Sequence, residues 1–127
     1  LNQNSEGMLT EMLEFTSAQE KMIAQNIVNV DTPNYVQKDL SLDKFQEVLR
    51  QRVDQKNNAA PGSVVFDDID LTAENSPAGI LFHDGNNRSI EQLEADQGKN
   101  ALMHNMIVGM LKNQFSMMEM ALREKVS

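Results

Sequence analysis

The chain of 127 residues contains no cysteine and no tryptophan, and only two histidines. Without cysteine it forms no disulfide, no thiolate metal site and no cysteine nucleophile. Basic residues are also scarce, because 11 Lys and Arg stand against 19 Asp and Glu, which gives a formal net charge of −8. Nucleic-acid binding requires clustered Lys and Arg. We therefore expect no nucleic-acid partner.

Long apolar runs are absent as well. No stretch approaches the ~18 consecutive apolar residues of a membrane span. The first residues lack the basic region and apolar core of a secretory signal peptide. We therefore expect no direct membrane insertion and no cleaved signal.

Residues suited to catalysis are few and do not form a known motif. His83 and Asp84 adjoin each other, whereas His104 lies some twenty residues further on. No phosphate-binding loop, nucleophile elbow or zinc-protease motif occurs. We predict that the protein is not an enzyme and has no catalytic residues, no metal site and no cofactor. A single histidine on a helical seam, such as His104, is usually a polar interface residue.

Apolar residues recur at alternating steps of three and four near both ends of the chain, which indicates amphipathic helices. The first run, from about Leu9 to Val30, uses positions 9, 12, 16, 19, 23, 26 and 30, and Asn4 or Ser5 could cap it. Pro33 ends this helix. In the last run Ser89 and Gln92 form a capping box. Positions 90, 93, 97, 100, 104, 107, 111, 114, 118, 121 and 125 then predict one helix over 89–125, roughly 50 Å long.

The middle of the chain is more polar. Asp39 or Ser41 could cap a short helix whose apolar stripe is Leu42, Phe45, Val48 and Leu49, and which stops near Val53. Residues 54–62 are typical of a loop, and 63–66 and 79–83 are plausible short strands. Whether this part is a small β module or irregular stays open.

These patterns predict a mainly α protein of one domain. Its long N- and C-terminal helices pair as an antiparallel coiled coil around a small irregular or β-containing middle. The segments are 1–54 with two helices, 55–88 as the middle, and 89–127 as the long C-terminal helix.

The apolar face of the last helix is wider than one partner helix needs. Beside the seam run two further lines, one through Ala101, Val108, Phe115 and Leu122 and one through Met103, Met110 and Met117. Either the helix over 42–53 or neighbouring subunits could cover them. Because soluble monomers rarely expose large apolar patches, we favour assembly. The predicted assembly face consists of Leu9, Met12, Ile23, Ile27, Val30, Ala101, Met103, Ile107, Val108, Met110, Leu111, Phe115, Met118 and Leu122.

One segment has a more specific sequence pattern than a helix followed by a helix-ending turn. Asn26-Ile27-Val28-Asn29-Val30-Asp31-Thr32-Pro33-Asn34-Tyr35 can bond its two Asn side chains to the last helical carbonyls or to the returning chain. It resembles the signature of the bacterial flagellar rod and hook proteins, in which Asn-Ile-Ala-Asn and two variable residues precede Thr-Pro-Gly-Tyr. Val28 stands for the Ala and Asn34 for the Gly. The matching residues are Asn26, Ile27, Asn29, Thr32, Pro33 and Tyr35.

The small size of the chain narrows this resemblance to the short members of the family. The segments Asp84-Gly85-Asn86-Asn87, Lys99-Asn100-Ala101-Leu102 and 111–116 resemble the short proximal rod members of the family, the FlgB type. The resemblance implies a structural subunit of the basal-body rod, which is both drive shaft and export channel. It implies export by the flagellar type III apparatus without a cleaved signal, and a location in the periplasmic rod. The implied partners are other copies, FlgC-type rod proteins, the FliE-type adaptor protein and the export gate.

Two alternatives remain. One is a soluble helical export chaperone or regulator with a Met-rich groove that binds a client helix. The other is an enzyme that uses His83, His104 or Asp84.

Overall fold

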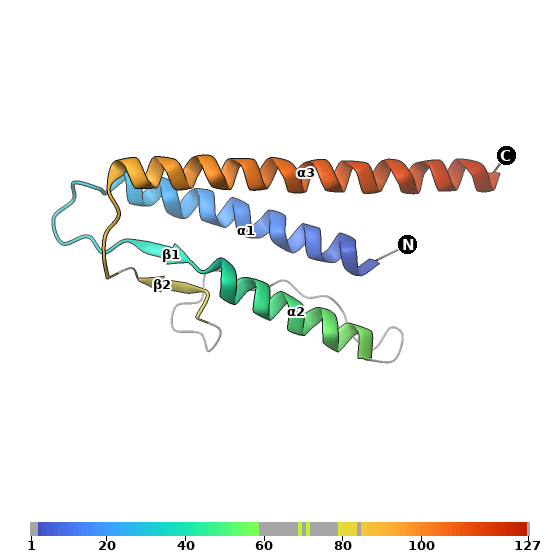
Figure 1. The fold of residues 1–127 in the computed structure, drawn as a ribbon, viewed down its shortest axis with the longest axis horizontal. Coiled ribbons are helices and arrows are strands. Elements are labelled where there is room, and N and C mark those ends of the chain that lie inside the picture. Colours follow the sequence, from blue (N-terminus) through green and yellow to red (C-terminus); the bar gives the residue numbers. More distant parts are fainter. Residues whose placement is uncertain (1–2, 59–68, 70, 72–78, 84, 127) are drawn as a thin grey trace.

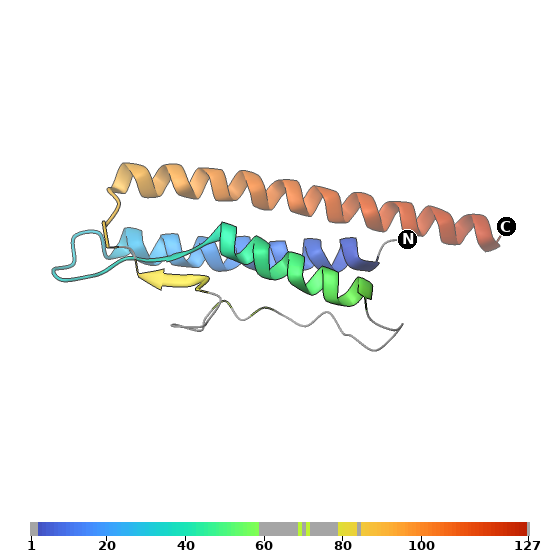
Figure 2. The same ribbon diagram turned by 60° about the horizontal axis from the view of Figure 1, so that its bottom comes forward.

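The computed structural model describes residues 3–58, 69, 71, 79–83 and 85–126 and shows a mainly helical fold with one small sheet (Figure 1). The elements along the chain are α1 (Gln3–Val28), β1 (Lys38–Leu40), α2 (Leu42–Asn58), β2 (Leu81–His83) and α3 (Ile90–Val126). α1 and α3 lie side by side and run in opposite directions (Figure 1). α2 and the sheet lie against α1 away from α3, and Figure 2 shows the same arrangement from a second side. The mainly α class and the two long terminal helices are thus confirmed.

The helix ends follow local chemistry. The capping box that begins α3 is confirmed, because the Gln92 amide donates to Ser89 Oγ at 3.2 Å and the Ser89 amide to Gln92 Oε1 at 3.0 Å. Of the two caps proposed for α2, Ser41 is used, since its Oγ accepts from the Lys44 amide at 3.3 Å. α1 begins at Gln3, so Asn4 and Ser5 lie within it and the cap predicted there is wrong.

Two predictions for the middle need correction. α2 does not stop near Val53 but continues to Asn58. Its last turn consists of solvent-facing polar residues, and Gln and Lys are good helix formers that need no apolar face to extend a helix. The strand predicted over 79–83 is found as β2, whereas the one predicted over 63–66 lies outside the described residues.

The sheet has two antiparallel strands, with Lys38 opposite His83 and Leu40 opposite Leu81. β1 was not predicted, because a strand of three residues is too short to show the alternation of apolar and polar residues that marks a strand in a sequence. The strands are 40 residues apart in the sequence, so their pairing is a tertiary contact rather than a local hairpin.

The core lies between α1, α2 and the sheet. Phe45 is fully buried, and its ring stacks on that of Phe15 with the centroids 4.5 Å apart. The other buried members are Leu40, Leu49, Ile69, Ile80 and Leu81. On α1 this core uses Phe15 together with the partly buried Met8, Met12, Ala18 and Met22, which lie three or four residues apart. Apart from Met12, these residues lie outside the predicted seam, so α1 is buried on two sides.

The predicted seam of α1 is divided between two neighbours. Thr16 contacts Asn100 and His104 of α3, whereas Gln19 and Asn26 bond to Asp39 and Lys38 of β1. On α3, every position of the predicted seam from 90 to 118 is buried or partly buried, while 121 and 125 are exposed. The seam predicted from the spacing is therefore the packed side of α3 over most of its length, and Leu93, Ile107 and Leu111 are its buried apolar residues.

Candidate functional site

The segment from Asn26 to Tyr35 forms the corner at which the chain leaves α1 and returns toward the sheet. The carboxamide of Asn26, only 4% exposed, spans the backbone of Lys38. Its Nδ2 donates to the Lys38 carbonyl at 2.8 Å, and its Oδ1 accepts from the Lys38 amide at 3.3 Å. The Tyr35 hydroxyl also donates to Asn26 Oδ1, at 3.5 Å. Asn26 thus ties the end of α1 to the start of β1.

Asn29 closes the corner from the other side. Its Nδ2 donates at 2.9 Å to the Gln25 carbonyl, which also accepts from the Asn29 backbone amide at 3.1 Å. Its Oδ1 accepts from the Thr32 hydroxyl at 3.1 Å, and its carbonyl from the Thr32 amide at 3.0 Å. Asn34 then adopts a left-handed conformation with φ of 63°, which Asn tolerates better than most residues.

The six residues that carry the resemblance therefore divide into two groups. Asn26, Asn29, Thr32 and Tyr35 are joined by hydrogen bonds within the corner. Ile27 is partly buried, and Pro33 is exposed in the turn.

Two further amide side chains that were not predicted complete the corner. Gln37, only 2% exposed, donates from Nε2 to the Arg88 carbonyl and accepts at Oε1 from the Arg88 amide, both at 2.9 Å. Asn87 donates from Nδ2 to the Tyr35 carbonyl at 2.8 Å and accepts at Oδ1 from the Gln37 amide at 3.1 Å. Asn87 belongs to the segment 84–87 on which part of the family resemblance rests, whereas nothing in the sequence marked Gln37.

A polar layer interrupts the seam between α1 and α3. Asn100, which is buried, donates from Nδ2 to the Thr16 carbonyl at 2.8 Å, and His104 Nδ1 lies 2.8 Å from Thr16 Oγ1. One turn away, Gln97 donates to Glu20 at 2.9 Å. His104 is thus the polar interface residue that its seam position indicated.

The predicted assembly face is divided by the structure. Ile23, Ile107 and Leu111 are buried within the chain. A second group is partly buried, namely Leu9, Met12, Ile27, Val30, Met103, Val108 and Met118. The residues that remain exposed are Ala101, Met110, Phe115 and Leu122.

The exposed apolar surface of α3 is larger than these four residues. Leu102, Met106, Met117 and Met120 are all more than half exposed. With Met110 they recur at steps of three, four or seven, so they share one side of the helix, which we call the Met strip. Among the described residues α2 makes no close contact with α3. The alternative in which the helix over 42–53 covers this face is therefore wrong.

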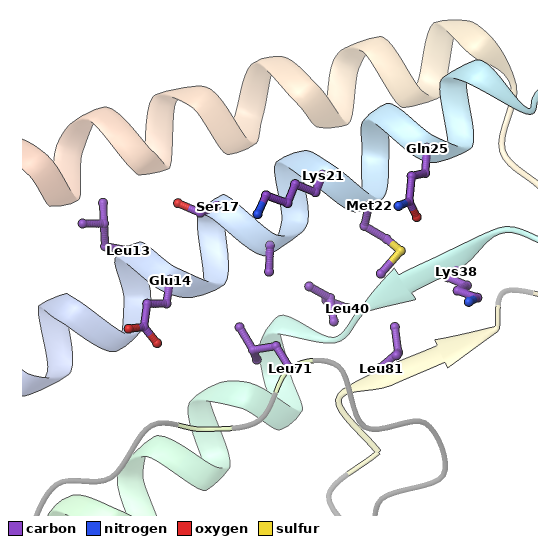
Figure 3. A pocket seen from close by; sticks show the side chains of 11 residues that line it. Leu13, Glu14, Ser17, Lys21, Met22, Gln25, Lys38, Leu40, Leu71 and Leu81 are labelled. Carbon is purple, nitrogen blue, oxygen red and sulfur yellow. The ribbon is translucent and has the colours of Figure 1, made fainter.

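A groove of about 520 Å³ runs along the opposite side of α1, between that helix and the sheet (Figure 3). Met22, Leu40 and Leu81 line it, and Glu14 and Lys38 lie toward its two ends. In the described part of the chain no group of three or more His, Cys, Asp or Glu side chains is placed to hold a metal ion. None of the described helices is both long and apolar enough to cross a membrane.

No family model matches the sequence, and no curated protein matches it either.

Proposed function

We propose that the chain is a structural subunit of the flagellar proximal rod, of the FlgB type. The observation that carries the proposal is the corner after α1. Four of the six residues that match the family signature, namely Asn26, Asn29, Thr32 and Tyr35, form side-chain hydrogen bonds within this corner, so most of the resemblance lies in residues with a defined structural role.

The two departures from the signature support the proposal further. Val28 stands where the family has Ala, and it is 81% exposed, so its extra bulk meets solvent rather than the core. Asn34 stands where the family has Gly, and its φ of 63° is the conformation that Gly supplies most easily. Each departure leaves the geometry of the corner intact.

In this proposal α1 and α3 form a coiled coil in the assembled rod, and the exposed residues of α3 contact neighbouring subunits. Exposed apolar residues occur on two sides of the seam, with the Met strip on one and Ala101, Phe115 and Leu122 on the other. Subunits related by a helical operator contact each other through two different faces. The proposed partners are other copies, FlgC-type rod proteins, the FliE-type adaptor and the export gate.

A second candidate rests on the Met strip alone. Flexible Met side chains suit a surface that binds client helices, as in a helical export chaperone or regulator. Such a protein stays in the cytoplasm and is absent from purified basal bodies.

The decisive experiment is deletion of the gene, with mass spectrometry of purified basal bodies from the parent strain. We expect the deletion strain to grow normally without flagella, and the protein to be found in parental basal bodies. Flagellated, motile deletion cells would contradict the proposal. Absence from the basal bodies of a strain that needs the protein for flagella would favour the chaperone.

Complementation with point variants tests the surface. Met110→Asp and Phe115→Asp place a charge on exposed apolar sites, so we expect folded subunits that fail to restore flagella because the charge is buried on assembly. Ser116→Asp adds the same charge at an exposed polar site and is the matched control. Normal motility with both apolar variants would count against assembly through α3. Leu111→Asp, which we also expect to block assembly, is less informative because Leu111 is buried within the subunit.

A further inference from the structure

Three carboxamide side chains each bridge two backbone groups near the head of the α1–α3 pair. Asn26 bonds both backbone groups of Lys38, Gln37 bonds both of Arg88, and Asn87 bonds the Tyr35 carbonyl and the Gln37 amide. All six distances lie between 2.8 and 3.3 Å. We call Asn26, Gln37 and Asn87 the amide clasp.

The clasp joins three places that the chain separates widely. It links the last turns of α1, the segment that enters β1, and the two residues directly before the Ser89 cap of α3. Asn26 and Gln37 are almost fully buried, so water competes little for their hydrogen bonds. The point at which α3 begins is therefore tied, through 35–38, to the end of α1.

The seam between the helices does not by itself select one alignment. Its apolar places recur every three or four residues, so a shift of α3 by seven residues, about 10 Å, again brings seam places opposite one another. The chain that connects the two helices does not fix their register either, because it is long and extends from Asn29 to Ser89. Specific contacts distinguish the registers. The polar layer at Thr16 is one such set, the pairing of β2 with β1 a few residues before Ser89 is a second, and the clasp is a third.

We propose that the amide clasp sets the register of α3 against α1, with Gln37 and Asn87 as positioning residues for the whole length of α3. The clasp determines the residue at which α3 leaves the corner, and a rigid helix carries that position to its far end. This inference concerns the free subunit, and it stands whether or not the protein assembles into a rod.

The test measures the distance between spin labels on the two helices. Because the chain has no cysteine, Ala24→Cys and Asn113→Cys introduce the only two labelling sites, one on α1 and one on α3, both exposed. In this background we compare two double variants. The clasp variant carries both Gln37→Met and Asn87→Ala, and the control carries both Gln46→Met and Asn105→Ala. The control makes the same changes at exposed positions outside the clasp.

We expect the parent and the control to show the same single distance. The clasp variant should show a second population, displaced by about 10 Å for a slip of seven residues at ~1.5 Å per residue, or by about 5 Å for one turn. A clasp variant that is less stable but keeps the single parental distance would overturn the proposal, because a merely stabilising role lowers the unfolding midpoint without moving the helices.

A milder variant covers the case in which the double substitution prevents folding. Asn87 is exposed, so Asn87→Asp should fold. It retains the acceptor for the Gln37 amide, but it places a carboxylate against the Tyr35 carbonyl. We expect a broadened or second distance for this variant, and an unchanged single distance would overturn the proposal.

Discussion

Thr16 Oγ1 and His104 Nδ1 lie 2.8 Å apart in the seam between α1 and α3. The Thr16 hydroxyl also lies 2.9 Å from the Leu13 carbonyl within its own helix. A hydroxyl has one proton, so when Thr16 donates it to Leu13 it accepts from His104 Nδ1, which then carries the ring proton of the neutral form. We expect the bond to Leu13 to hold, and therefore the tautomer protonated at Nδ1.

This tautomer can be observed directly. Nitrogen-15 NMR of the neutral ring should show His104 protonated at Nδ1. Thr16→Val removes the acceptor and should abolish this preference, whereas Ser17→Ala, at the exposed neighbouring position, should leave it unchanged. An Nε2-protonated ring in the parent protein would contradict the assigned donor and acceptor.

Two phenylalanines should respond very differently to truncation. Phe45 is fully buried against Phe15, so Phe45→Ala should lower the free energy of unfolding by about 3–5 kcal/mol. Phe115 is half exposed, so Phe115→Ala should change it by less than about 0.5 kcal/mol. Urea unfolding of the free subunit measures both. Equal losses would show that Phe115 is buried in the free subunit.

The capping box of α3 should contribute measurable stability. Ser89→Ala removes the acceptor for the Gln92 amide and should cost about 1 kcal/mol in urea unfolding. Ser116→Ala, the same change at an exposed site within α3, should be neutral or slightly stabilising, because Ala is the better helix former. A neutral effect of Ser89→Ala would mean that the cap is not formed in solution.

Substitutions at Asn34 should affect stability according to how well the new residue tolerates a left-handed backbone conformation. A β-branched residue is poorly suited to φ of 63°, so Asn34→Val should destabilise the fold by about 1–2 kcal/mol. Asn34→Gly should be tolerated, because Gly adopts positive φ without steric cost. Thermal unfolding of both variants provides the comparison. Equal stability of the Val and Gly variants would exclude the left-handed turn.

Much of the local structure was predictable, because it depends on residues close together in the sequence. The capping box needs only Ser89 and Gln92, which are three residues apart. The cap of α2 was narrowed to two residues, and the structure selects Ser41 because it directly precedes α2, whereas Asp39 lies within β1. The choice therefore depended on the pairing of β1 with β2, about forty residues further along the chain.

Three features that the sequence did not reveal share one cause, which is their dependence on tertiary contacts. The second apolar stripe of α1, with Phe15 at its centre, has the same spacing as the first, but its meaning appears only when α2 and the sheet cover it. β1 is too short for a periodic signal and exists through its pairing with β2. Gln37 and Asn87 look like ordinary surface amides until the corner brings them together.

The sequence by itself determined the helical class, the cap at Ser89 and the face that α3 turns toward α1, because helix periodicity and capping act within a few residues. Tertiary structure alone decided that α2 packs on α1 and leaves the Met strip of α3 uncovered. It also decided that three amides from separate segments meet in one clasp. Both outcomes depend on which distant segments exclude water from one another, and no local spacing encodes that choice.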